Sequence, residues 1–139
     1  MPPKITTSVH SLVEAAEREI ETLSVEDAVK LAGDDNIQLV DIRDVRELQR
    51  DGKVPGAFHC PRGMLEFWID PQSSYHKPTF AQDKKYVFFC AGGLRSALAA
   101  KTAQDMGLKP VAHVKGGFGD WKKAGGPVTE PEAPPAKKT

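Results

Sequence analysis

Residues 86–96 read Tyr-Val-Phe-Phe-Cys-Ala-Gly-Gly-Leu-Arg-Ser, and this stretch decides the fold. Its first four residues form a continuous run of aromatic and β-branched side chains, which is typical of a central parallel strand covered on both faces. From Ser96 to Met106, alanine and leucine recur at helical spacing. The stretch therefore predicts a buried strand, a glycine-rich turn beginning at Cys90, and a helix.

Cys90 lies at the carboxyl end of the predicted strand, which is the edge where open α/β sheets bind ligands. A loop that enters a helix presents unpaired backbone N–H groups and the positive end of the helix dipole. This setting favours the thiolate, the nucleophilic form of cysteine. Gly92 and Gly93 let the backbone curl so that its N–H groups converge on one point, and Arg95 can close this cup from the helix side.

The alternative for Cys90 is an inert role, because free cysteine is among the residue types most often buried in protein interiors. An inert cysteine would not need two glycines and an arginine directly after a strand. The sequence therefore favours a nucleophile at this position.

Strand and helix patterns alternate along the rest of the chain. Ser24 reads as the N-cap of a helix that stops near Gly33. Strands are predicted over 38–42, 57–59, 86–90 and 110–114, with helical stretches between them. This alternation predicts an α/β fold with a central parallel β-sheet flanked by helices on both faces.

Two segments flank the alternating region. Residues 9–21 have an amphipathic helical pattern, which we expect to pack against the main body. Residues 129–139 contain three prolines and two lysines and almost nothing apolar, which predicts a disordered tail. The expected organisation is a helical extension over 1–21, one domain over 22–128, and a tail over 129–139.

Composition excludes several classes of function. The formal net charge is zero, with 19 basic and 19 acidic residues, so no nucleic-acid partner is indicated. No signal-peptide pattern or membrane-spanning run is present, and we expect a cytoplasmic protein without a membrane partner. The two cysteines lack metal-site or disulfide-framework spacing. The four histidines likewise show no metal-ligand spacing, and none is placed by the sequence as a base for Cys90.

The pattern Cys-x-x-Gly-x-Arg-Ser at residues 90–96, between a strand and a helix, resembles the active-site loop of the rhodanese-like sulfurtransferases. Three other segments resemble motifs of that family and follow in its order. They are Leu-Val-Asp-Ile-Arg-Asp at 39–44, Val-Pro-Gly-Ala-Phe-His-Cys-Pro at 54–61, and Gly-Gly-Phe at 116–118 followed by Trp121 and Gly-Pro-Val at 126–128. The resemblance spans about residues 22–128 and implies the rhodanese-like fold.

The resemblance also implies an activity. The Cys90 thiolate would take the sulfane sulfur from a donor such as thiosulfate and pass it to a thiophilic acceptor, cyanide or a thiol. A protein sulfur acceptor is a further option. Cys90 would be the catalytic residue, and no metal or organic cofactor would be needed. The residues expected to bind substrate and stabilise the sulfur through their backbone N–H groups are Ala91, Gly92, Gly93, Leu94, Arg95 and Ser96.

Two other functions stay open. The fold resembles that of cell-cycle dual-specificity phosphatases, whose loop has five residues between cysteine and arginine. Here there are four, which suits a single sulfur better than a phosphate and weighs against a phosphatase or arsenate reductase. The other alternative is a non-catalytic binding or sulfur-carrying module, although family members without activity commonly lack the loop cysteine.

The segment 61–80 contains an apolar cluster and is long for a connection. Phe67 and Trp68 either line the mouth of the Cys90 pocket or pack on the sheet. A similar Arg-Gly-Met-Leu-Glu-Phe-Trp stretch occurs in a group of bacterial single-domain rhodanese-like proteins. Arg46 is expected to add positive charge near the pocket. We interpret the remaining candidates as mainly structural: ion pairs for Asp41, Arg43 and Asp44, burial for Cys60, and helix packing for Trp121.

Overall fold

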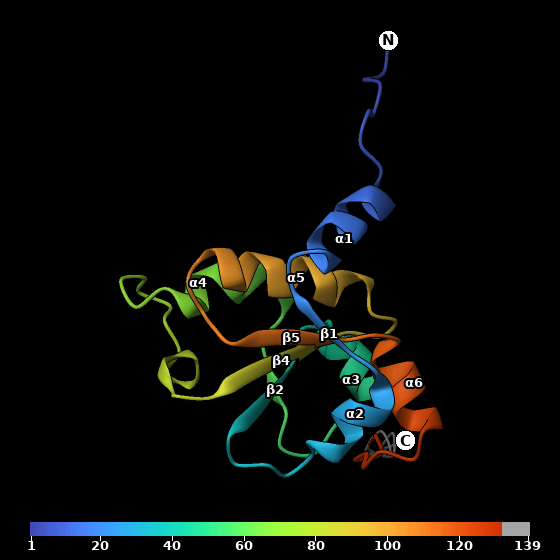
Figure 1. The fold of residues 1–139 in the computed structure, drawn as a ribbon, viewed down its shortest axis with the longest axis vertical. Coiled ribbons are helices and arrows are strands. Elements are labelled where there is room, and N and C mark those ends of the chain that lie inside the picture. Colours follow the sequence, from blue (N-terminus) through green and yellow to red (C-terminus); the bar gives the residue numbers. More distant parts are fainter. Residues whose placement is uncertain (132–139) are drawn as a thin grey trace, which may run out of the picture.

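The computed structural model describes residues 1–131 of the chain, and within them five parallel strands form one sheet in the order β1-β5-β4-β2-β3 (Figure 1). Most of the predicted tail, residues 132–139, lies outside the described residues. The strands are β1 Glu21–Leu23, β2 Ile37–Asp41, β3 Phe58–His59, β4 Lys85–Phe89 and β5 Val111–Val114. The predicted α/β class and parallel sheet are confirmed.

Strand β4 occupies the centre of the sheet because its side chains are apolar on both faces. Phe88 and Cys90 face one hydrophobic core, and Val87 and Phe89 face the other. All four are buried, as the continuous apolar run predicts. The central position places Cys90 at the carboxyl end of the most enclosed strand of the sheet.

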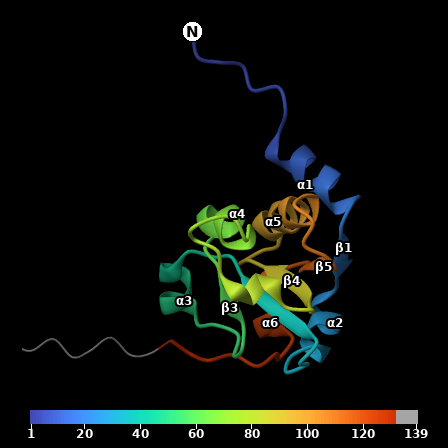
Figure 2. The same ribbon diagram turned by 90° about the vertical axis from the view of Figure 1, so that its left-hand side faces the viewer.

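Helices cover both faces of the sheet (Figures 1 and 2). Helices α1, α4 and α5 lie on one face, and α2 and α6 lie on the opposite face. Helix α3 follows β2 at the carboxyl edge of the sheet and has no buried residue. The bounds are α1 Val9–Glu17, α2 Val25–Lys30, α3 Val45–Asp51, α4 Leu65–Ile69, α5 Leu94–Asp105 and α6 Gly117–Lys123, with short 3₁₀ turns at Arg62–Met64 and Pro78–Ala81.

Local sequence signals set several helix ends. Ser24 caps α2 by accepting a hydrogen bond from the backbone N–H of Asp27, as the sequence predicts. The carboxylate of Asp44 accepts from the N–H of Arg46 at the start of α3. Asp44 is thus a helix cap, and its only ion pair among the described residues is with Arg46. Trp121 is buried on the sheet and donates to the carbonyl of Pro127, which confirms its packing role.

The N-terminal region differs from the prediction. The helix expected over 9–21 ends at Glu17, and residues 21–23 form the edge strand β1 instead. A strand of three residues is too short for its side-chain alternation to be visible in the sequence. Helix α1 packs on α5 through Val13 and Ala16. The proposed division into extension, domain and tail stays a prediction.

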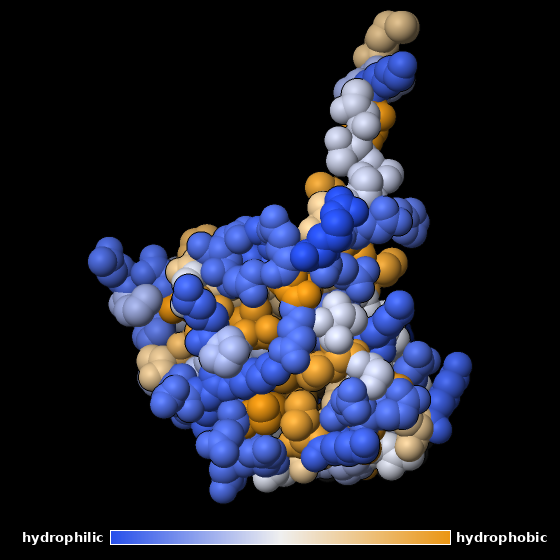
Figure 3. Space-filling view, in the orientation of Figure 1, coloured by the Kyte–Doolittle hydropathy of each residue, from blue (hydrophilic) through white to orange (hydrophobic). Residues whose placement is uncertain are grey.

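Hydrophilic residues cover much of the face of the molecule seen in Figure 3, with hydrophobic residues visible across its middle, while the segment before α1 projects from the body. This surface agrees with a chain in which 27% of the residues are charged. Every helix within residues 1–131 is too short or too polar to cross a membrane.

Candidate active site

Cys90 follows directly after β4 and is almost completely buried, with 1% of its surface exposed. The backbone N–H of Gly93 points at its sulfur, with 3.1 Å between N and Sγ. Gly93 adopts a left-handed conformation, with φ of +100°, and caps the twelve-residue helix α5. The sulfur therefore sits at the positive end of a helix dipole, as the sequence predicts. Among the N–H groups of residues 91–96, only that of Gly93 bonds to the sulfur within the described residues.

The first turn of α6 holds the Cys90 loop in place. The N–H of Phe118 donates to the carbonyl of Cys90 at 2.8 Å, and the N–H of Gly119 donates to that of Ala91 at 3.1 Å. Gly117 lies so close to the loop that a Cβ atom there would be 2.3 Å from the Cys90 carbonyl oxygen. The Gly-Gly-Phe motif at 116–118 therefore fixes the backbone that carries the cysteine.

Arg95 extends from the first turn of α5 to the carboxylate of Glu47 on α3. Two hydrogen bonds of 2.9 and 3.0 Å join the guanidinium to the carboxylate. The backbone N–H of Asp44 also donates to Glu47, at 2.8 Å, so the carboxylate is held on two sides. The Arg95 guanidinium lowers the pKa of Glu47 below its ordinary value. Glu47 in turn raises the pKa of Arg95, with a smaller contribution from Cys90.

Ser96, in the first turn of α5, links the cysteine to a buried histidine. Its hydroxyl oxygen is 3.7 Å from Cys90 Sγ and 3.0 Å from Nδ1 of His113 on β5. The opposite ring nitrogen, Nε2, is 3.3 Å from the carboxylate of Glu17 on α1. Burial lowers the pKa of His113, and the Glu17 carboxylate opposes this shift. These four side chains form a continuous polar line inside an otherwise apolar core.

Asp41 and Arg43 form the buried ion pair that the sequence predicts. Their closest atoms are 2.7 Å apart, and both side chains are almost fully buried. The Arg43 guanidinium also donates to the carbonyl of Gly52 and lies 4.1 Å from the centre of the Phe118 ring. Because Phe118 donates its N–H to Cys90, this pair supports the cysteine loop through α6.

The structure places the predicted pocket-wall residues as follows. Trp68 packs against the core and contacts the ring of Phe58. Phe67 is exposed and meets Tyr75 edge-on. Arg46 is paired with Asp44, and 84% of its side chain is exposed. No hydrogen bond or ion pair joins these three residues to the Cys90 loop within residues 1–131, and their role as a wall stays a prediction.

Cys60 is fully buried at the end of β3, as expected. Burial raises the pKa of its thiol to about 12. It therefore stays protonated near neutral pH and is a poor nucleophile there.

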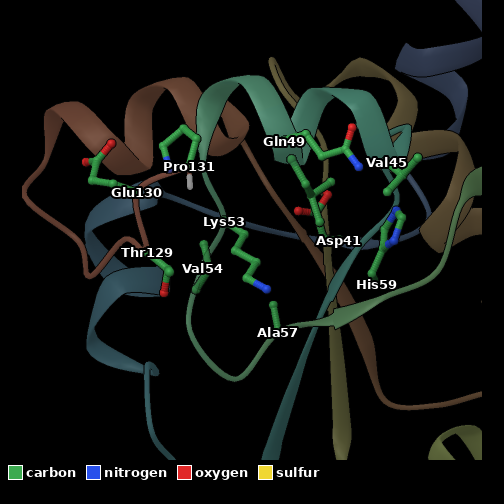
Figure 4. A pocket seen from close by; sticks show the side chains of 11 residues that line it. Asp41, Val45, Gln49, Lys53, Val54, Ala57, His59, Thr129, Glu130 and Pro131 are labelled. Atoms are coloured by element: carbon green, nitrogen blue, oxygen red, sulfur yellow. The ribbon is translucent and has the colours of Figure 1, made fainter. Parts of the chain in front are cut away.

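A cavity of about 450 Å³ lies below α3 (Figure 4). The backbone of Lys53 pairs with that of Thr129 at its rim. Cys90 does not line this cavity, because the side chains that reach it from β2 face the opposite core from the cysteine. The lining residues are Asp41, Val45, Leu48, Gln49, Lys53, Val54, Ala57, His59, Thr129, Glu130 and Pro131.

The structure adds three side chains that sequence reasoning did not assign to the site: Glu47, His113 and Glu17. A signal existed for His113, since it is the one polar residue in the buried strand β5 and a buried polar group needs a partner. Glu47 has a local signal as the third residue of the capping box that Asp44 opens, but this signal does not predict its pairing with Arg95. Glu17 shares α1 with Glu14, and nothing local distinguishes the two. Within residues 1–131, no three His, Cys, Asp or Glu side chains are grouped to hold a metal ion.

Residues 24–124 match the family model of the rhodanese-like domain. The chain belongs to this family. The match contains the Cys90 loop, its Gly-Gly-Phe support and the Asp41–Arg43 pair. It does not contain α1.

Three proteins illustrate the range of relatives of this rhodanese-like protein. The putative sulfurtransferase YtwF of Bacillus subtilis is 30% identical over 105 residues, which cover 76% of this chain and 90% of that protein. The thiosulfate sulfurtransferase GlpE of Shewanella oneidensis is 29% identical over 102 residues, covering 73% and 92%. A solved structure from Rhodopseudomonas palustris has 62% identity and a TM-score of 0.90, and covers 93% of this chain and 99% of that one. That protein is of unknown function and is described as a possible tyrosine phosphatase.

Proposed function

We propose that this rhodanese-like protein moves a sulfane sulfur from a small donor such as thiosulfate to a thiophilic acceptor, with a persulfide of Cys90 as the intermediate. The observation that carries the proposal is the hydrogen bond from the Gly93 N–H to Cys90 Sγ at the N-terminus of α5. A sulfur held by a backbone donor at a helix N-terminus is stabilised as an anion. The described activity of the Shewanella oneidensis relative supports the same chemistry.

The reaction has two half-reactions. The Cys90 thiolate attacks the sulfane sulfur of thiosulfate, a new sulfur–sulfur bond forms, and the original one breaks as sulfite leaves with its electron pair. The acceptor, cyanide or a thiolate, then attacks the outer sulfur of the persulfide. The bond to Cys90 breaks, the thiolate is restored, and ping-pong kinetics follow.

The residues of the loop supply the positive groups that stabilise the persulfide. The outer sulfur of the persulfide carries negative charge, and the helix N-terminus and Arg95 are the positive groups beside it. Glu47 fixes the Arg95 guanidinium and neutralises part of its charge. Ala91, Gly92 and Leu94 are exposed around the buried sulfur and would form the contact surface for donor and acceptor.

Intact-mass spectrometry tests this proposal directly. Incubation with thiosulfate is expected to add one sulfur, about 32 Da, and cyanide or dithiothreitol is expected to remove it. Peptide mapping should place the added sulfur on Cys90. The matched control is Cys60→Ser, which should gain the same mass because the Cys60 thiol stays protonated near neutral pH. An adduct on Cys60 with Cys90 unmodified would refute the assignment.

Phosphatase activity is the second candidate, because the Rhodopseudomonas palustris protein with 62% identity is described as a possible tyrosine phosphatase. Loop length argues against it here, since only four residues separate Cys90 from Arg95. In addition, Gly93 packs so tightly that a Cβ atom there would be 2.9 Å from the N atom of Gly116. A cup held this closely favours a single sulfur over a phosphoryl group.

Lengthening the loop should separate the two activities. One glycine inserted between Gly93 and Leu94 is expected to lower sulfur transfer from thiosulfate to cyanide at least about tenfold, because the donor N–H no longer meets the sulfur. The wild-type protein should show no burst of product from an aryl phosphate. The control is a glycine inserted between Asp34 and Asp35, in an exposed turn far from the loop in the sequence. Full sulfur transfer by a folded loop variant would remove the loop-length argument against the phosphatase. An aryl phosphate burst by the wild type would favour the phosphatase.

A further inference from the structure

The polar line from α1 to the cysteine offers a route for the proton that Cys90 must lose. We propose that Glu17, His113 and Ser96 form a relay in which His113 is the base that deprotonates Cys90 through the Ser96 hydroxyl. The proposal deepens the proposed function and rests on it, since the reaction requires Cys90 as a thiolate. The three contacts of the relay are 3.3 Å, 3.0 Å and 3.7 Å long, from Glu17 to Cys90.

The partners of the histidine ring fix the direction of the hydrogen bonds. Nε2 faces the carboxylate of Glu17, which can only accept, so Nε2 carries the proton. Nδ1 of the neutral ring is then an acceptor, and the Ser96 hydroxyl must donate to it. The Ser96 oxygen is left to accept from the Cys90 S–H. Every donor in the line thus points away from the cysteine and toward Glu17.

Burial keeps the line isolated from water. Ser96, His113 and Cys90 are each at most 1% exposed, so a proton from the sulfur has no direct path to solvent in the closed structure. The side chain of Glu17 is 31% exposed, which places the outer end of the relay at the surface. The buried groups therefore connect the enclosed thiol to bulk water through α1.

The charges around the relay favour a neutral His113 before the proton transfer and stabilise the imidazolium after it. Burial lowers the pKa of His113, Glu17 from α1 opposes this shift, and Lys115, which follows β5, adds to it. Helix α5 contributes the neutral Ser96 to the ring, and it contributes the Arg95 guanidinium beside the cysteine. The resting histidine is neutral and able to accept a proton, and Glu17 stabilises the imidazolium that forms.

The proton step balances within the protein. The Cys90 S–H proton passes to the Ser96 oxygen as the Ser96 hydroxyl proton passes to Nδ1 of His113. The products are a Cys90 thiolate and a His113 imidazolium, with Ser96 and the Glu17 carboxylate unchanged in charge. No oxidant or reductant takes part, and the proton returns by the same path when the thiol is restored.

The pH dependence of alkylation tests the relay without using sulfur transfer. The rate at which iodoacetamide modifies Cys90 would be measured between pH 5 and 10 by mass spectrometry. Without His113 as the base, Cys90 should have to ionise without proton transfer through Ser96. His113→Asn and Ser96→Ala are each expected to move the midpoint of the profile up by at least about one pH unit, which means a rate near neutral pH about tenfold lower. Glu17→Gln should shift it in the same direction by a smaller amount.

Two comparisons separate a relay from a merely structural role. The double variant His113→Asn with Ser96→Ala should shift the midpoint no further than either single variant, because residues that act as a unit are not additive. Glu14→Gln on the exposed side of α1 is the matched control for Glu17→Gln and should keep the wild-type profile. A structural role would lower the unfolding temperature and leave the midpoint in place.

The outcomes also distinguish the relay from the proposed function. At pH 10 His113→Asn should still form the persulfide with thiosulfate, because the thiolate then forms without the base. A shifted alkylation profile with no persulfide would keep the relay and refute sulfur transfer. A wild-type midpoint in folded His113→Asn would overturn the relay. If His113→Asn does not fold, a wild-type midpoint in Glu17→Gln, whose change lies near the surface, would overturn it instead.

Discussion

Cys90→Ser is expected to abolish sulfur transfer from thiosulfate to cyanide, a loss of at least about 10⁴-fold, which is the scale seen when a covalent nucleophile is removed. A serine hydroxyl is a much weaker nucleophile than a thiolate near neutral pH. The substitution is close to isosteric, and the serine oxygen can keep the hydrogen bonds with Gly93 and Ser96. The measurement is the rate of thiocyanate formation by the purified variant.

The controls for this variant are its fold and the other cysteine. The unfolding temperature of Cys90→Ser should stay close to that of the wild type, since no cavity and no unpaired polar group is created. Cys60→Ser should retain sulfur transfer. Appreciable thiocyanate formation by Cys90→Ser would show that another residue carries the sulfur.

Gly117→Ala is expected to destabilise the protein by about 2–5 kcal/mol, which combines a strained backbone with an overpacked contact. Gly117 has φ of +58°, and its Cβ would be 2.3 Å from the carbonyl oxygen of Cys90 and 2.8 Å from that of Ala91. Backbone atoms cannot move aside as a flexible side chain can. For a chain of this size the unfolding temperature should fall by roughly 8–20 °C, as measured by thermal unfolding.

Gly119→Ala is the matched control, two residues further along α6. Its Cβ would lie 3.5 Å from the carbonyl oxygen of Ala91, an ordinary contact, so its unfolding temperature should change little. Folded Gly117→Ala should also transfer sulfur more slowly than Gly119→Ala, because the displaced Cys90 carbonyl shifts the sulfur. Equal stability of the two variants would mean that the start of α6 does not set the position of the cysteine loop.

The fold was largely predictable because its strongest signals are local. The apolar run before Cys90 determines the central strand, and the glycines after it determine the turn into α5. Ser24 marks the start of α2 by its capping chemistry. Strand β1 escaped prediction because an edge strand of three residues with two exposed side chains carries no periodic pattern. Its place is determined by pairing with β5, which is a tertiary effect.

The cysteine and its loop were also predictable, whereas their partners were not. Cys90 and Arg95 belong to one short motif, so the sequence itself places them together. Glu47 is 48 residues from Arg95, and Glu17 is 96 residues from His113. Contacts of this kind depend on the positions at which α3 and α1 pack relative to the sheet. Only His113 has a recognisable signal in the sequence, because it is a polar residue in a strand that the core encloses.

Helix α1 lies ahead of the segment that matches the family, residues 24–124, yet it brings Glu17 to the buried His113. The family-model match and the proposed proton relay therefore begin at different places in this chain. Under the proposed relay, two proteins with identical cysteine loops would differ in the pH at which that cysteine reacts if the segment before the loop domain differs.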